Sequence, residues 1–132
     1  MAVVLCFGNP YVPEDALAIE LGESLEAPGF TFVPTPAPES IIDHLEEELY
    51  VMDVAEGVSE VTLITDPSKL RLPPRVTAHD IDPALFLRLV ETLYGVKVPV
   101  IALPMGVERE VVRGQLLELL SRLTREKEPG GE

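Results

Sequence analysis

The sequence has one cysteine, one asparagine and one glutamine, and it has no long hydrophobic run. A single cysteine, Cys6, excludes an internal disulfide, and its place within an apolar run predicts that it fills space in the core. No apolar stretch approaches the ~20 residues that span a bilayer, and no positively charged segment precedes a cleavage site. We therefore expect a soluble, cytoplasmic protein without membrane insertion.

Positive charge is also scarce. Ten lysines and arginines stand against 23 aspartates and glutamates, which gives a formal net charge of −13. This charge repels the phosphates of nucleic acids and anionic lipid surfaces, so we expect no nucleic-acid partner. The scarcity of amides, which are thermolabile, together with 13 prolines favours a thermophilic source.

Hydrophobic residues make up 46% of the 132 positions, which predicts a folded chain with a single core. Five apolar, β-branched runs predict strands, and several are continuous, as in strands covered on both faces. The predicted strands are Ala2–Phe7, Phe30–Val33, Leu49–Asp53, Glu60–Thr65 and Val98–Leu103.

Apolar residues with helical spacing lie between and after these strands. They form three groups: Leu17, Leu21 and Leu25; Leu85, Phe86, Leu89, Val90 and Leu93; and Val112, Leu116, Leu119, Leu120 and Leu123. A shorter helix is expected over Glu39–Glu47, and Gly95 stands where a helix C-terminus favours glycine. We also expect Glu14 and Asp15 in the first turn of the first helix, where acids interact favourably with the helix dipole.

This alternation predicts an α/β fold, a three-layer sandwich with a mostly parallel central sheet of about five strands flanked by helices. Residues 1–124 are expected to form one domain and residues 125–132 a solvated tail. Ligands of such sheets usually bind beyond the carboxyl ends of the strands. That rule selects three residues: Asp15 after the first strand, Asp53 at the end of the third and His79 after the fourth.

Two interpretations of these three residues remain open from the residues alone. Each can be a helix cap or a loop anchor, which is the commoner role of such residues near element ends. Together, two carboxylates and an imidazole suit a borderline divalent cation such as nickel or zinc, with open positions for other ligands. The second histidine, His44, lies among acidic residues and is expected on the surface. There is no phosphate-binding loop, dinucleotide fingerprint or nucleophile elbow.

The order of these motifs resembles that of the NiFe-hydrogenase maturation endopeptidases. The resemblance is carried by Gly8-Asn9 followed by Glu14-Asp15, by the strand "LYVMD" that ends in Asp53, and by "TAHDIDPALFLRL" with His79 ahead of a leucine-rich helix. It extends from Val3 to about Leu123.

The resemblance implies a fold, an activity and a partner. The protein would be a nickel-dependent endopeptidase that removes a C-terminal peptide from the hydrogenase large-subunit precursor after nickel insertion. Asp15, Asp53 and His79 would contact a nickel ion that the precursor supplies, with Glu14 as the alternative to Asp15. Either a metal-polarised carbonyl or a carboxylate-activated water would fit this chemistry.

The sequence departs from the family pattern in two places. Ala16-Leu17-Ala18 replaces residues that are usually glycine-rich, and the proline-rich segment "VPTPAPES" at Val33–Ser40 replaces a glycine-rich recognition loop. Glycine permits close backbone approach and proline removes a donor, so these departures concern substrate recognition. The alternative is therefore a non-proteolytic accessory protein that binds the metal or the precursor on the same fold.

Overall fold

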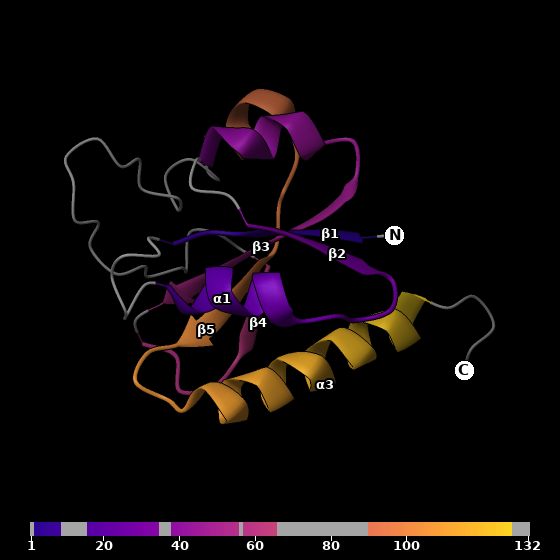
Figure 1. Cartoon of the computed structure of the whole chain (residues 1–132). Helices are drawn as coiled ribbons and strands as arrows, with labels where there is room; N and C mark the ends of the chain where they lie inside the picture. The colour runs from indigo at the N-terminus through magenta and orange to yellow at the C-terminus, as the bar shows by residue number, and fades with distance from the viewer. Residues whose placement is uncertain (1, 9–15, 35–37, 56, 66–89, 128–132) are drawn as a thin grey trace.

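The computed structural model describes residues 2–8, 16–34, 38–55, 57–65 and 90–127. In chain order the elements are β1 (Ala2–Cys6), α1 (Leu17–Ser24), β2 (Phe30–Pro34), the 3₁₀ helix η2 (Pro38–His44), β3 (Glu48–Ala55), β4 (Thr62–Ile64), β5 (Val100–Pro104) and α3 (Arg109–Lys127). The strands form one sheet in the order β2-β1-β3-β5-β4 (Figure 1). All neighbouring strands are parallel except β4, which pairs antiparallel with β5.

The five strands lie where the sequence predicts them, with ends shifted by at most two residues. The predicted α/β fold with a mostly parallel five-stranded sheet is therefore confirmed. The central strands β1 and β5 are buried along their whole length, which explains why their sequences are apolar without alternation.

Helical elements cover both faces of the sheet (Figure 1). Residues of α1 and α3 share one hydrophobic cluster with Val4, Cys6 and Met52 of the strands. Ile41 of η2 and Val90 share a second cluster with the strand residues of the opposite face. The core therefore consists of two layers of side chains, one on each side of the sheet.

The long helix α3 has the apolar stripe that the sequence predicts. All five of its predicted core residues are buried: Val112, Leu116, Leu119, Leu120 and Leu123. Residues 90–94 are also helical, and Gly95, with φ of 72°, ends this segment by donating its N–H to the carbonyl of Glu91 at 2.9 Å. The remainder of that predicted helix lies outside the described residues.

Three helix boundaries differ from the prediction. Helix α1 begins at Leu17 with Ala16 at the N-cap position, and the acid in its first turn is Glu20. Glu14 and Asp15, which the sequence predicts in the first turn, lie outside the described residues. The expected short helix is a 3₁₀ helix, and α3 continues through Lys127. The sequence places Arg125 and Glu126 in the tail, but both lie in the exposed last turn of α3. This turn directly follows Leu123, which is still buried in the core.

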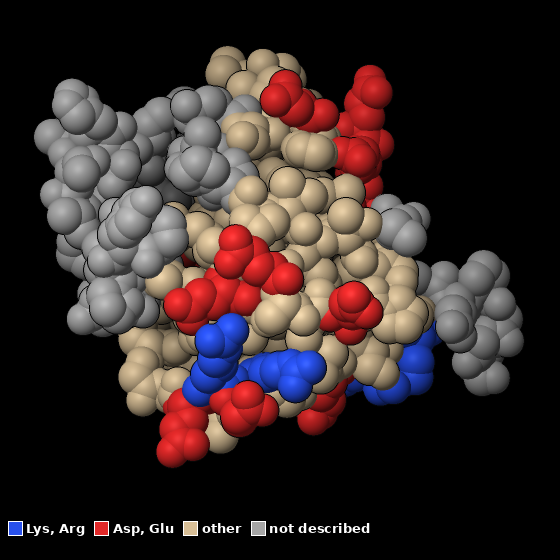
Figure 2. Space-filling view, viewed as in Figure 1, with Lys and Arg blue, Asp and Glu red and all other residues tan. Residues whose placement is uncertain are grey.

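Acidic side chains are distributed over the surface, and Figure 2 shows several of them around an uncharged area on one face. None of the helices in the described ranges is long and apolar enough to cross a membrane.

Candidate functional site

The carboxyl ends of β1, β3 and β5 meet at one edge of the sheet because the three strands are parallel. Gly8, with φ of 148°, directs the chain away from the end of β1. The turn that follows β5 contains Met105, which is partly exposed. The third strand, β3, brings Asp53 to this same edge.

Asp53 is fully buried, and it is the one polar or charged residue in the buried core of the described chain. The sequence predicts that Asp53 ends its strand, but β3 continues to Ala55. Val51 and Ala55, two residues before and after Asp53, lie on the same face of β3. Asp53 is also paired in register with Ala102 of β5. Its side chain therefore belongs to the face of the sheet that η2 covers.

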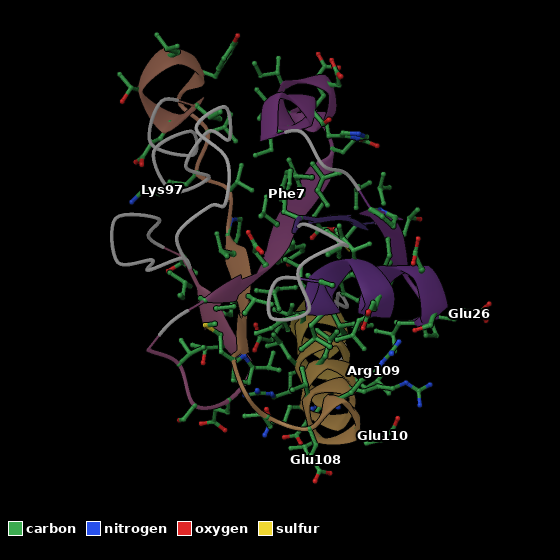
Figure 3. The ribbon with its side chains drawn as sticks, turned by 60° about the vertical axis from the view of Figure 1, so that its left-hand side comes forward. Phe7, Glu26, Lys97, Glu108, Arg109 and Glu110 are labelled. Carbon is green, nitrogen blue, oxygen red and sulfur yellow. The ribbon has the colours of Figure 1, made fainter. Side chains whose placement is uncertain are left out.

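The described neighbours of Asp53 on its face of the sheet are apolar. Phe7 donates its N–H to the carbonyl of Met52 at 2.9 Å, which places Phe7 next to Asp53 across the β1–β3 pair. Figure 3 shows Phe7 on the side of the sheet that η2 covers. The Asp53 Oδ1 accepts a hydrogen bond from the N–H of Val54 at 2.8 Å. This bond orients the carboxylate and offsets part of the free energy that burial of a charge costs.

Cys6 lies on the opposite face of the sheet from Asp53. The pKa of the Cys6 thiol is raised to about 12, chiefly because the thiol is buried; a backbone hydrogen bond with Val33 lowers it in part, and the nearby Asp53 charge adds a smaller increase. The thiol donates to the carbonyl of Val4 at 3.6 Å. Cys6 is therefore a protonated core residue rather than a nucleophile, as predicted from the sequence.

Gly22 of α1 lies directly against Cys6. A Cβ atom at this glycine would stand 2.6 Å from the Cys6 Sγ, which is closer than non-bonded atoms approach. Gly22 thereby lets α1 pack closely on β1. A glycine on the apolar side of a helix is the sequence signal for such a contact.

The other two predicted site residues, Asp15 and His79, lie outside the described residues. The structure therefore tests neither their proximity to Asp53 nor a shared metal site. In the described part of the chain, no group of three or more histidine, cysteine, aspartate or glutamate side chains could hold a metal ion. His44 makes a partly exposed hydrogen bond with the Glu47 carboxylate through its Nδ1, and this agrees with its expected place on the surface.

The Ala16-Leu17-Ala18 segment, which departs from the glycine-rich pattern, begins α1. Ala16 and Ala18 are both buried, and Ala18 belongs to the core cluster under the helix. The alanine side chains therefore contribute packing at positions where glycine would contribute none.

Two solved structures are similar to this chain over most of its length. The NiFe-hydrogenase maturation protease HycI from Thermococcus kodakarensis KOD1 has 18% sequence identity and a TM-score of 0.58, with 92% of this chain and 90% of that chain covered. The hydrogenase maturating endopeptidase HybD from E. coli has 15% identity and a TM-score of 0.61, with 95% and 92% covered. No protein-family model matches the sequence, and no curated protein matches it either. The chain therefore has the fold of the hydrogenase maturation proteases.

Proposed function

We propose that this protein is a maturation endopeptidase that removes a C-terminal peptide from the nickel-loaded large-subunit precursor of a hydrogenase. The carrying observation is Asp53, a fully buried carboxylate at the carboxyl edge of the central strand. Aspartate is almost never buried in this way unless it is paired or functional. The fold shared with two solved maturation proteases supports the same proposal.

In this proposal the nickel ion belongs to the substrate, and Asp53 is one of the residues that contact it, together with Asp15 and His79. The hydrogen bond from the Val54 N–H fixes one carboxylate oxygen, so the group is oriented before the precursor arrives. Its burial away from water strengthens its attraction to a cation. Such a carboxylate can ligate the metal while the metal polarises the scissile carbonyl, or it can activate a water molecule. The partner is the precursor, and the reaction takes place in the cytoplasm.

The test uses the precursor from the source organism, nickel-loaded and nickel-free, and intact-mass analysis after incubation with the protein. We expect nickel-dependent loss of a C-terminal peptide. Asp53→Asn, which keeps the shape of the side chain but removes its charge, should slow this loss by about 10² to 10⁴-fold. Glu60→Gln, the same change at an exposed position, is the matched control.

Other results would separate the alternatives. A precursor that stays intact but forms a complex with the protein would favour the accessory role, in which the fold binds without cutting. Equal cleavage by the wild type and by a folded Asp53→Asn variant would remove Asp53 from the mechanism. Thermal unfolding of each variant shows whether a lost activity reflects a lost fold.

A further inference from the structure

The edge strand β2 offers a backbone surface that no described strand uses. β2 pairs with β1 on one side, and it stands at the end of the strand order. The Ala2 N–H donates to the carbonyl of Gly29 at 2.9 Å. Because the groups of a parallel strand alternate in direction, the backbone groups of Thr31 and Val33 face β1, whereas those of Phe32 face outward.

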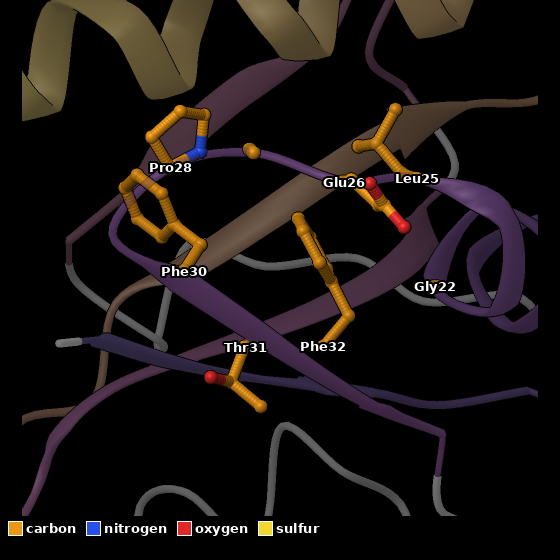
Figure 4. Close-up of a pocket in the computed structure, with 8 residues that line it drawn as sticks. Gly22, Leu25, Glu26, Pro28, Phe30, Thr31 and Phe32 are labelled. Atoms are coloured by element: carbon orange, nitrogen blue, oxygen red, sulfur yellow. The ribbon is translucent and has the colours of Figure 1, made fainter.

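A hollow lies along this edge on the α1 side of the sheet. Its volume is about 560 Å³, and Phe30 and Phe32 line it from β2, with Gly22 and Leu25 on the α1 side. Figure 4 shows the rings of Phe30 and Phe32 on the same face of the strand. Both rings are only partly buried, and both pack against the core cluster under α1 and α3. An outward-facing backbone beside a hollow that can hold alternate side chains is the arrangement that binds an extended peptide as an added strand.

A second hollow of about 320 Å³ adjoins the first. The two share Glu26, Ala27, Pro28 and Phe30, and the second extends to Leu117 and Leu120 of α3. Together they form a continuous groove that follows β2 and then turns over α3, where its lining is mainly apolar. The groove is therefore long enough to accept several side chains of one peptide.

The charge around the groove indicates which peptide it accepts. Glu26 is the charged residue that lines the hollow along β2. Arg125 lines only the α3 end, where it donates to the Ser121 Oγ at 3.0 Å. A second copy of this chain would bring another net charge of −13 to the same edge. Repulsion between two such copies disfavours self-association, whereas a cationic segment is attracted.

We propose that the outer edge of β2, with the groove beside it, binds an extended lysine- or arginine-bearing segment of the precursor by strand addition. The inference rests on the proposed function in taking the precursor as the partner. The carboxyl end of β2 pairs with Cys6 of β1, and Cys6 pairs in turn with Met52 of β3, so this end of β2 lies at the edge of the sheet that also carries Asp53. A strand added to β2 lies three strand spacings, about 14 Å, from β3, so roughly four extended residues separate the bound segment from the scissile bond.

The first variant for the test is Phe32→Pro. It removes the outward N–H, keeps all hydrogen bonds to β1 and is compatible with an edge strand. Phe32→Ala is the matched control, because it removes the ring but keeps the N–H. Glu26→Lys reverses the charge in the groove, and Glu60→Lys makes the same change at an exposed residue beside the opposite edge strand, β4. Circular dichroism establishes that each variant is folded.

The probes are two fluorescein-labelled peptides, one of alternating valine and lysine and one of alternating valine and glutamate, and binding is read by fluorescence anisotropy. We expect the lysine peptide to bind preferentially and to slow hydrogen exchange at the Phe32 amide. Phe32→Pro should weaken its binding by about tenfold relative to Phe32→Ala, the value of one hydrogen bond. Glu26→Lys should weaken binding, and Glu60→Lys should leave it unchanged. Equal binding of both peptides, or equal binding by Phe32→Pro and Phe32→Ala, would overturn the proposal.

Cleavage of the precursor separates this proposal from the proposed function. If the wild type cuts the nickel-loaded precursor and Phe32→Pro and Glu26→Lys leave KM unchanged, the strand-addition site fails and the endopeptidase stands. If the precursor stays intact but the lysine peptide protects the Phe32 amide, the endopeptidase fails and the site stands. A raised KM in both variants, with kcat unchanged, supports both.

Discussion

The central strand β3 and the edge strand β2 contrast within one sheet. All but the first residue of β3 are buried, and the one charged group among them is Asp53. All five residues of β2 are partly or fully exposed, including two phenylalanines. The centre thus holds a chemical group in a fixed orientation, and the edge holds surface that a partner can cover. Rigid burial suits reactivity, and partial exposure suits recognition.

Shortening a buried side chain in an inner strand, compared with one in the edge strand, tests this contrast most strongly. Leu103→Ala in β5 removes a fully buried side chain and leaves a cavity, so the free energy of unfolding should fall by about 2–5 kcal/mol. Val33→Ala in β2 should cost about 1 kcal/mol, because Val33 is only partly buried. Urea unfolding measures both values. Similar losses at the two positions would mean that the edge strand is as tightly packed as the centre.

The contact between α1 and β1 gives the next largest effect. Gly22→Ala should destabilise the fold by about 1–2 kcal/mol, since overpacking against the Cys6 Sγ exceeds the gain in helix propensity. Gly114→Ala in α3 is the matched control, because its Cβ would meet nothing within 4 Å, and it should gain up to about 1 kcal/mol.

The Cys6 side chain itself sharpens that prediction. In the double variant of Gly22→Ala and Cys6→Ala the sulfur is gone, and the nearest atom to the new methyl group is the Cβ of residue 6 at 3.2 Å. The double variant should therefore be more stable than the sum of the two single effects predicts. A double-mutant cycle from thermal unfolding should give an interaction of about 0.5–3 kcal/mol. Simple additivity would show that the Sγ is not the atom that limits the approach of α1.

Alkaline pH should weaken the buried centre through the same residue. The pKa of Cys6 rises from its ordinary value of 9.0 to about 12 on folding. The thiol is therefore protonated in the folded state while the unfolded chain ionises, and stability falls as pH rises from about 9 to about 12.

Urea unfolding at about pH 8 and about pH 10 should show a loss of about 1 kcal/mol that depends on Cys6. Burial also raises the pKa of Tyr50, so Tyr50 contributes to the pH dependence of the wild type as well. The loss due to Cys6 is therefore the difference between the wild type and Cys6→Ala, measured at both pH values. The same pH dependence in both proteins would place the titrating group elsewhere.

The smallest effect is expected at the periphery. Arg109 of α3 and Glu20 of α1 form an ion pair, with Nη1 and Oε1 3.4 Å apart and both side chains 48% exposed. Water and salt screen such a pair, so Glu20→Gln should change stability by at most about 0.5 kcal/mol. Thermal unfolding at low and high salt measures the change. A larger loss would show that this pair fixes the position of α1 over α3.

The hydrophobic pattern alone predicted the five strands, the stripe of α3 and the place of Cys6 in the core. These features follow from periodicity and apolar content, which act over a few neighbouring residues. Helix ends were less well predicted. Ala16, a buried residue without a side-chain hydrogen bond to the helix, occupies the N-cap of α1, so no capping side chain in the sequence marks this start.

For the candidate site, sequence supplied residue types and chain order, and it selected Asp53. Asp15 and His79 stay predictions. Only the tertiary structure decided that Asp53 is fully buried within β3, beside Phe7 and Ala102, since these contacts join strands far apart in the chain. The same holds for the Gly22–Cys6 contact and for the edge position of β2, because strand order depends on how the whole sheet assembles.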